Sequence, residues 1–547
     1  MPTASTRREF LRSSLVAGAA TTLAPLGACV SGSTSSSSDP FDLLLRAGTI
    51  VDGTGRPGFV ADLGLRGDRI TAIGQLGSAS AARVLDVRGL VVAPGFVDAH
   101  AHSDLRRNPK AQSKVFQGVT MDVTGPDGGS PFPETPDAAD DTATARSTCS
   151  DFTAWAAMHG PIAIDIGTYV GHGTVRRRVL GPVGRAATEA ELRAMQDLVA
   201  QALEQGALGL SSGLEYFPGN MAPTDELVAL CKVAARFDRP YVTHIRNEDD
   251  QLLVAIDEAI AIARDSGAPL LVSHLKVGGK PNWSKLEPML AKIAAARAEG
   301  LDVHCDAYPY EAWSTSLATN FPGWAKEGGQ FVARLQDPAE RQRMRAETEQ
   351  SVAANGGWGT LMLGGGLAAA DRALLGRRID EIAKERGQEP FAVACDLLTR
   401  GSVSILGFGI QTSDMDRILT QPWCLVASDG SGVPISGRSG HPRSFGAFPR
   451  AFRRYVREQR ALSIEAMVHK MTAMPASVLR LRDRGVLAEG KLADVVVFDA
   501  DRFTDQATWL EPQQYATGVQ FLVVNGVVAV DGGSQTEAMA GRVVRGA

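Results

Sequence analysis

Two histidines, one residue apart, follow a short apolar run. His100 and His102 end the segment APGFVDAHAH, residues 93–102. Alternate side chains of an extended strand point to the same side, so both imidazoles face one way. A single metal ion can then bind both ring nitrogens at about 2.0–2.1 Å. The pair therefore predicts a metal site, although histidines at this spacing also occur in packed or solvated positions.

Two more histidines and an aspartate also end apolar runs. His244 follows residues 241–243, His274 follows residues 270–273, and Asp429 follows residues 425–428. Alone, such a histidine is more often a core residue, and such an aspartate more often caps a helix or turn. Joined to the histidine pair, they form a complete ligand set in which Asp429 is both metal ligand and general base.

The elements that must position these side chains alternate regularly. Predicted strands end at residues 212, 244, 274 and 306, in steps of 32, 30 and 32 residues, with helices between them. This pattern favours a parallel α/β fold, either a barrel or a doubly wound sheet. In a (β/α)8 TIM-like barrel, the carboxyl ends of the strands converge on one face, where active sites form. We therefore expect the five side chains to meet on that face.

Both chain ends predict short antiparallel strands. Apolar runs separated by turn signals occupy residues 43–45, 61–65, 70–73 and 84–87, and again residues 493–498, 521–524 and 527–530. Asn525-Gly526 is a strong hairpin signal. We predict a small β-sandwich domain from residues 41–93 plus 484–547. The barrel would then cover residues 94–483, with a helical insertion at about 320–400 that forms a lid.

Residues 1–40 predict a targeting segment. Paired arginines, Arg7 and Arg8, precede an apolar stretch from about 15 to 28 that is too short to span a bilayer. The pattern is similar to a twin-arginine export signal. Cys29 ends a lipobox-like segment and precedes a Ser-rich tether. We expect a periplasmic protein or a membrane-anchored lipoprotein with a lipid anchor at Cys29, although signal-peptidase cleavage nearby would leave the same pattern.

Composition excludes several classes of protein. The 547 residues are 44% hydrophobic and 21% charged, and the formal net charge is −5. This is typical of a globular protein and gives no indication of a nucleic-acid partner. The six cysteines contain no CxxC pair. We therefore expect neither a disulfide framework nor a zinc finger. The oligomeric state is not indicated.

Taken together, the motifs resemble the amidohydrolase superfamily, and more narrowly the N-acyl-D-amino-acid deacylase (D-aminoacylase) family. The resemblance extends from about residue 41 to 530. It includes GHGTVR at 171–176, GALGLSSGLEY at 206–216, HIRNE at 244–248, SHLK at 273–276, DAYPY at 306–310 and HPR at 441–443. It implies a metal-dependent amidohydrolase with one or two zinc ions, which acts on a small N-acyl amino acid or a similar carboxylate-bearing amide.

One turn departs from the family pattern. The family has a cysteine metal ligand within a Gly-Asn-Cys-Gly turn, and this chain has Gly125-Pro126-Asp127-Gly128. Asp127 could bind or bridge metal, because carboxylates suit zinc. It could also be a simple turn residue. The change leaves the number of metal ions open.

The resemblance also implies a substrate site. Arg443 is expected to pair with the substrate carboxylate through its planar guanidinium, supported by Tyr308 and Ser314. Lys276 would contact the substrate side chain or acyl group, or would form only a salt bridge. Two further residues have either a pocket-lining, carbonyl-polarising role or a structural one: Tyr216 and His172.

The implied reaction is amide hydrolysis by metal-activated water. The ion would lower the pKa of a bound water to about 7 and polarise the carbonyl. Asp429 would take the water proton and return it to the leaving amine. Alternatives are a dipeptidase or a cyclic-amide hydrolase of the same superfamily. Those enzymes commonly use a carboxylated lysine, which has no counterpart at a strand end here. A non-catalytic metal-binding lipoprotein is a third alternative.

Overall fold

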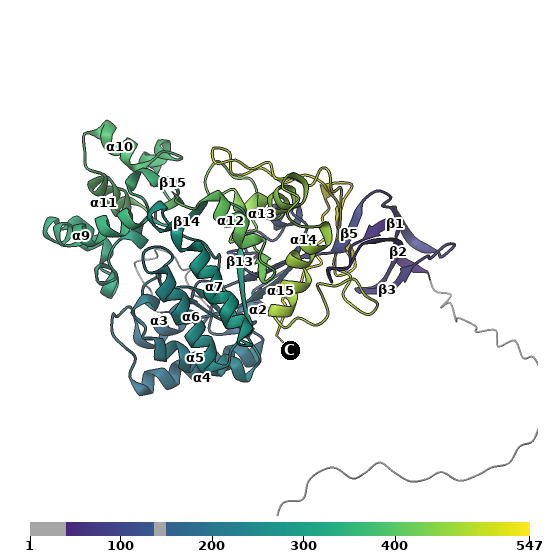
Figure 1. Ribbon diagram of the computed structural model, residues 1–547, viewed down its shortest axis with the longest axis horizontal. Coiled ribbons are helices and arrows are strands. Elements are labelled where there is room, and N and C mark those ends of the chain that lie inside the picture. Colours follow the sequence, from purple (N-terminus) through teal and green to yellow (C-terminus); the bar gives the residue numbers. More distant parts are fainter. Residues whose placement is uncertain (1–39, 136–148, 547) are drawn as a thin grey trace, which may run out of the picture. The chain divides into compact units, whose positions relative to one another are not determined.

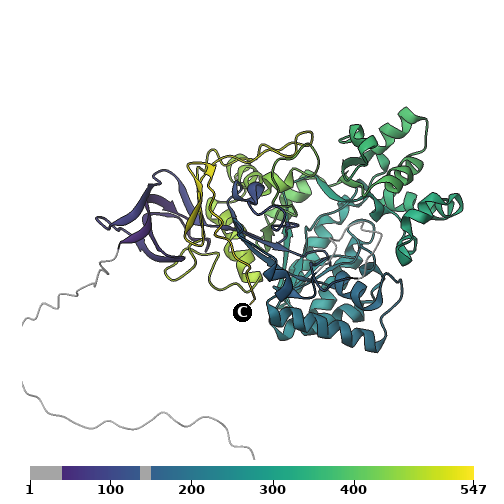
Figure 2. The ribbon, with the colours of Figure 1, turned by 180° about the vertical axis from the view of Figure 1, so that it is seen from behind.

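Strands from the two ends of the chain lie side by side in one sheet, purple and yellow in Figures 1 and 2. The computed structural model describes residues 40–135 and 149–546, and residues from Pro40 onward form one compact unit. Its sheet has the order β21-β20-β19-β18-β5-β1-β2-β3, with β4 also pairing with β1. The nine strands are β1 (Phe41–Ile50), β2 (Phe59–Arg66), β3 (Arg69–Gly74), β4 (Ala81–Asp86), β5 (Val91–Pro94), β18 (Val495–Phe498), β19 (Val519–Val524), β20 (Val527–Asp531) and β21 (Ser534–Gln535).

The pairing corrects one prediction. Strands β1, β2 and β3 are antiparallel as expected, but β1 pairs in parallel with both β4 and β5. The reason is that the segment after β3 carries the chain back, so that Ala81 begins its strand beside Phe41. The Asn525-Gly526 hairpin is confirmed, because both residues have positive φ, 49° and 83°, between β19 and β20. A sandwich of two sheets is not confirmed, since the nine strands are joined in one.

The middle of the chain contains the predicted parallel strands. One sheet has the order β6-β7-β8, and the other has the order β17-β13-β12-β11-β10-β9. The two sheets are not joined into a closed barrel. Their strands are β6 (Phe96–Asp98), β7 (Val119–Thr124), β8 (Asp165–Thr168), β9 (Val170–Gly171), β10 (Leu210–Gly213), β11 (Tyr241–His244), β12 (Leu270–Val272), β13 (Val303–Ala307) and β17 (Cys424–Val426).

Helices connect the parallel strands, and three of them, α5, α6 and α7, lie between the strand ends where the periodicity predicted helices. In α5, for example, Leu227, Leu230 and Ala234 are buried and form an apolar stripe along the helix. The helix α4 begins with a capping box between Thr188 and Glu191, which satisfies its first backbone N–H groups. These helices are α3 (His172–Leu180), α4 (Glu189–Gln205), α5 (Thr224–Arg236), α6 (Leu252–Ser266) and α7 (Leu286–Ala298).

The predicted insertion at about 320–400 is helix-rich, and it is flanked by two strands that form a small sheet with a strand inside it. Its helices gather away from the parallel strands and pack around a hydrophobic cluster of their own (Figure 1). The three-stranded antiparallel sheet β14-β16-β15 was missed, because its strands are short and separated by helices. The elements are β14 (Ala312–Ser316), α8 (Phe331–Gln336), α9 (Pro338–Ala354), β15 (Leu361–Gly365), α10 (Ile379–Arg386), α11 (Pro390–Arg400) and β16 (Ser404–Phe408).

Three short helices follow the last parallel strand: α13 (Arg443–Phe452), α14 (Ile464–Met471) and α15 (Ala473–Val478). Within the described ranges, no helix has both the length and the apolarity needed to cross a membrane. The predicted export signal, the Ser-rich tether and Cys29 lie outside these ranges.

Candidate metal centre

All five predicted ligands lie at or just beyond the carboxyl ends of parallel strands. His100 and His102 follow β6, His244 ends β11, His274 follows β12, and Asp429 follows β17. His274 and Asp429 have positive φ values of 32° and 49°. Left-handed backbone at residues other than glycine is uncommon and clusters at functional sites. The unusual backbone of these two turns therefore marks His274 and Asp429 as candidate functional residues.

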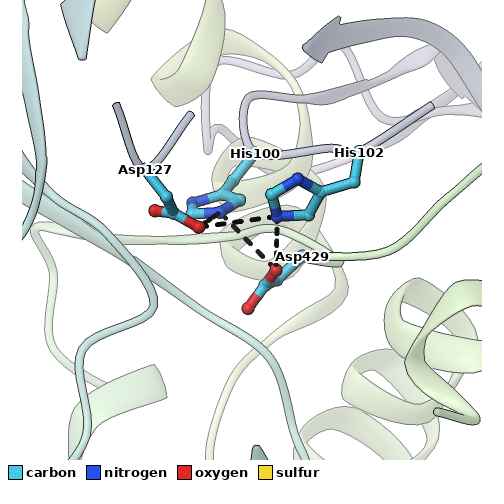
Figure 3. A group of neighbouring side chains, drawn as sticks. All are labelled: His100, His102, Asp127 and Asp429. Carbon is cyan, nitrogen blue, oxygen red and sulfur yellow. Dashed lines mark hydrogen bonds and ion pairs between the residues drawn. The ribbon is translucent and has the colours of Figure 1, made fainter. Parts of the chain in front are cut away.

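Four side chains form a first group, in which Asp127 joins three predicted ligands (Figure 3). Asp429 Oδ1 lies 3.0 Å from His102 Nε2 and 3.6 Å from His100 Nε2. Asp127 Oδ2 lies 3.4 Å from His100 Nε2 and 3.5 Å from His102 Nε2. All of these ligand atoms lie within 4.8 Å of one another. One ion could contact all four side chains.

The other oxygen of Asp127 faces a second group. Asp127 Oδ1 lies 3.4 Å from His274 Nε2, which lies 2.9 Å from His244 Nδ1. Asp127 itself has a φ of 55° in the turn after β7. The carboxylate thus stands between two pairs of imidazoles and presents one oxygen to each pair.

The donor set fits a divalent cation. The buried atoms His100 Nε2 and Asp127 Oδ1 have no hydrogen-bond partner. Buried polar atoms are rarely left in this state, because an unmade hydrogen bond is costly. Imidazole nitrogens and carboxylate oxygens are the donors that zinc binds. A cation between these atoms would satisfy both.

Charge in the group matches that conclusion. Burial alone would lower the pKa of His100, but the carboxylates of Asp127 and Asp306 raise it well above its usual value. Burial alone would raise the pKa of Asp429, but Arg443 and His100 lower it well below its usual value. The acidic side chains are therefore ionised and ready to bind a cation, which would displace protons from the imidazoles.

A second layer of carboxylates holds the imidazoles, and sequence reasoning gave these residues no role. Asp306 Oδ2 lies 3.4 Å from His100 Nδ1, and its Oδ1 accepts the His274 backbone N–H at 2.7 Å. Glu215 Oε2 lies 3.1 Å from His244 Nε2, and Glu248 Oε1 lies 3.1 Å from His274 Nδ1. Carboxylates on the far ring nitrogen orient metal-binding histidines. The strand-end position of Asp306 was the one available signal.

The predicted substrate-binding arginine lies beside Asp429. Arg443 Nη1 lies 2.7 Å from Asp429 Oδ2, and the guanidinium carbon lies 4.8 Å from the centre of the Tyr308 ring. Both charged side chains are buried. The backbone N–H of Arg443 donates to His441 Nδ1 at 2.9 Å, which fixes the start of α13. The arginine is therefore placed at the metal group and not in a flexible loop.

A cavity of about 720 Å³ opens onto the centre. Lys276 is buried in its wall, and its Nζ donates to Glu248 Oε1 at 2.6 Å and contacts His274 Nδ1 at 2.9 Å. From the sequence, a salt bridge was one of two possibilities for Lys276, and the contact with Glu248 is such a salt bridge. Tyr216 OH lies 3.3 Å from His244 Nδ1. The predicted substrate-site residues that line the cavity are Tyr216, Lys276, Tyr308 and Ser314.

His172 is placed elsewhere. It is fully buried at the start of α3 and does not line the cavity, and its Nε2 lies 2.8 Å from Glu226 Oε1. Arg176 binds the other oxygen of Glu226 at 2.5 Å. The structure therefore places His172 away from the cavity, in a buried contact with Glu226.

The sequence matches the Amidohydrolase family model over residues 83–530. A D-aminoacylase of Alcaligenes xylosoxydans xylosoxydans is 37% identical over 519 residues, which cover 93% of this chain and 98% of that protein. A crystal structure of D-aminoacylase is similar with a TM-score of 0.79 at 35% identity, covering 92% of this chain and 100% of that one. N-acyl-D-glutamate deacylase from Bordetella bronchiseptica, solved with zinc and a phosphonate inhibitor, has a TM-score of 0.78 at 34% identity, covering 93% and 100%.

Proposed function

The chain belongs to the amidohydrolase family, and from this premise we propose that it hydrolyses the amide bond of N-acyl-D-amino acids. The products are a carboxylic acid and a free D-amino acid. One observation carries the proposal: four histidines and two aspartates from five strand ends form two contiguous groups, and Arg443 lies beside them. The D-aminoacylase and the zinc-bound deacylase that resemble the chain over nearly its whole length give further support.

Two ligand sets follow from the contacts. His100, His102 and Asp429 would hold one zinc ion, and His244 and His274 would hold a second. Asp127 would bridge them with one oxygen to each, as its 3.4 Å contacts to His100 and His274 suggest. When bound, zinc polarises an amide carbonyl and lowers the pKa of water to about 7.

Asp429 has the position of the general base. Its Oδ1 faces the histidine pair, where the attacking water would lie, so the carboxylate can accept the proton of that water. The same carboxyl group then returns the proton to the nitrogen of the leaving amine. The first transfer needs an ionised carboxylate, and Asp429 is ionised in the resting protein because its pKa lies well below its usual value. The second transfer uses the proton that Asp429 has accepted.

Arg443 is suited to bind the carboxylate of the substrate. The guanidinium of arginine presents several N–H donors in one plane, which match a carboxylate in a bidentate arrangement. The Tyr308 hydroxyl is buried and has no hydrogen-bond partner, so it can donate to the same group. A substrate carboxylate held there would lie close to Asp429, because Arg443 Nη1 is 2.7 Å from Asp429 Oδ2.

We also propose that the two parallel sheets close into a (β/α)8 barrel. Support comes from the backbone N–H of Asp429, which donates to His100 O at 2.9 Å, and from a parallel bridge between Ala101 and Gly430. Only Tyr169 separates β8 from β9 at the other junction. For the nine-stranded sheet built from both chain ends, we likewise propose that it forms a small β-sandwich beside the barrel.

The N-terminal sequence supports a proposal on location. The twin arginines and Cys29 favour export and a lipid anchor. Expression with radiolabelled palmitate tests this, and loss of label in Cys29→Ala is the expected result. Equal labelling of both proteins would contradict the anchor.

The decisive experiment is a substrate screen. Zinc-loaded protein without the N-terminal segment is incubated with N-acetyl and N-formyl derivatives of D- and L-amino acids, and the free amino acid is measured. Hydrolysis of D-derivatives that stops after chelation is expected. Hydrolysis of dipeptides or cyclic amides alone would favour the related enzymes of the superfamily. Bound zinc without hydrolysis of any of these substrates would favour a binding protein.

A further inference from the structure

A lysine lies buried beneath the metal centre, where the reaction gives it no task. Lys114 belongs to the short helix α1 (Gln112–Val115), and its side chain is fully buried. Burial disfavours a charged ammonium group, and a lysine is almost never fully buried without a partner. Its contacts therefore need an explanation.

The ammonium group of Lys114 links the segment that precedes His100 to the segment that precedes Asp429. Lys114 Nζ donates to Asp98 Oδ2 at 2.5 Å and to Ser428 Oγ at 2.8 Å. Asp98 lies two residues before His100, and Ser428 lies directly before Asp429. One buried cation thus contacts side chains on two of the three segments that present ligands of the first group.

The carboxylate of Asp98 continues this link. Its Oδ1 accepts the backbone N–H of His100 at 3.3 Å and that of Ser428 at 3.0 Å. The backbone N–H of Asp429 in turn donates to His100 O at 2.9 Å. The spacing between His100 and Asp429 is therefore set by this buried network.

A third strand is tied to the same ammonium group. Asp122, on the strand that leads to Asp127, has its Oδ1 3.3 Å from Lys114 Nζ. Asp122 Oδ2 accepts the Ser103 hydroxyl at 2.5 Å, and Ser103 Oγ accepts the backbone N–H of Gly432 at 2.7 Å. The hydrogen-bond network around Lys114 therefore also includes Ser103, which follows His102, and Gly432, which follows Asp429.

We propose that Lys114 is a positioning residue that sets the affinity of the centre for zinc, by locking the segments of His100, Asp127 and Asp429 together. The inference rests on the proposed function, because it requires that these residues bind metal. The Lys114 ammonium group donates hydrogen bonds to Asp98 and Ser428, and its positive charge also faces Asp122 Oδ1 at 3.3 Å. Loss of a residue that orients metal ligands typically weakens metal binding 10- to 100-fold.

The chain offers a matched control away from the centre. Arg484 is also buried between two aspartates, with Nη1 2.7 Å from Asp165 Oδ2 and 3.3 Å from Asp494 Oδ2. Asp165 begins β8, so this cluster lies at the amino end of a strand, whereas the ligands lie at carboxyl ends. Replacing either cation leaves two buried carboxylates, so the loss of stability should be similar.

The test compares zinc affinity in Lys114→Met and Arg484→Met. Each purified variant is titrated with zinc against a chromogenic chelator, and its melting temperature is measured without metal. Both variants should melt at lower temperature, but only Lys114→Met should bind zinc at least tenfold more weakly than the wild type. Unchanged affinity in Lys114→Met, or equal weakening in both variants, would overturn the inference.

If the single variants do not fold, charge-balanced double variants decide the question. Lys114→Met/Asp122→Asn and Arg484→Met/Asp165→Asn each remove one buried charge of either sign. Weaker zinc binding is again expected for the first variant alone, and equal affinity in the two would overturn the proposal. Zinc binding by the wild type distinguishes a failure of the proposed function from a failure of the Lys114 role. A wild type that binds no zinc contradicts the proposed function, whereas a wild type that binds zinc as tightly as the Lys114 variants contradicts only the role of Lys114.

Discussion

Replacing Asp429 by asparagine tests the general base most directly. The amide oxygen of asparagine can keep the position of Oδ1, 3.0 Å from His102 Nε2, but it cannot accept a proton at ordinary pH. Zinc should therefore still bind. Loss of a general base lowers turnover by about 10²- to 10⁴-fold. This corresponds to about 3–5 kcal/mol in the barrier.

The substitution should also lower the stability of the metal-free protein. Asp429 Oδ2 lies 2.7 Å from Arg443 Nη1, and both side chains are buried. Removing one partner of a buried ion pair costs about 3–5 kcal/mol, because the remaining charge is left without compensation. The double variant Asp429→Asn/Arg443→Met should recover much of that loss.

The assay measures free D-amino acid released from an N-acetyl-D-amino acid, with bound zinc determined in the same sample. Asp306→Asn is a suitable control, since Asp306 contacts His100 Nδ1 at 3.4 Å but does not face the substrate cavity. Asp306→Asn should bind zinc more weakly than the wild type, but its turnover should recover when zinc is present at a saturating concentration. Turnover of Asp429→Asn within tenfold of the wild type, at full zinc content, would refute the base assignment.

Three further predictions address the substrate, the metal and the response to pH. Arg443→Met should raise KM about 10- to 100-fold more than it lowers kcat, because a charge-assisted bond to the substrate carboxylate is lost; an equal loss for a substrate amide without a carboxylate would contradict this. Chelation of zinc should abolish hydrolysis and lower the melting temperature, and added zinc should restore both; hydrolysis that persists in metal-free protein would contradict the metal assignment. Burial raises the pKa of Asp249 to about 7, so this carboxyl stabilises the fold below pH 4 and the contribution is lost as pH rises through 7. Asp249→Asn should therefore be more stable than the wild type at pH 8 but not at pH 4, as measured by urea unfolding; an identical pH dependence in both proteins would contradict the shift.

Local pattern was enough to predict the strands β10 to β13 and the grouping of the side chains that end them. The runs that became β10 to β13 are almost entirely buried, as expected for strands covered on both faces. A lone histidine at the end of such a run is more often a core residue, so His244 and His274 could be placed only because they end successive strands and accompany the His100 and His102 pair. Asp127 was left open, because a Pro-Asp-Gly turn has the same sequence whether or not it binds metal.

Long-range pairing could not be predicted. The parallel contact of β1 with β4 depends on which strand edge is free after the β2–β3 meander forms, and no local signal encodes that choice. Glu215 and Glu248 were quoted within motifs but given no role. Acidic residues after strands are common, and only the folded chain shows that these two reach the far nitrogens of the imidazoles.

The position of Asp127 has a chemical consequence. Among the described residues, the candidate metal groups contain only histidine and carboxylate side chains, and the five described cysteines are buried. A thiolate ligand can be converted by peroxide to sulfenic and then sulfinic acid, which destroys a metal site, whereas a carboxylate has no such chemistry. The enzyme should therefore withstand hydrogen peroxide and alkylating reagents such as iodoacetamide, and it would need no reductant in its surroundings to stay active.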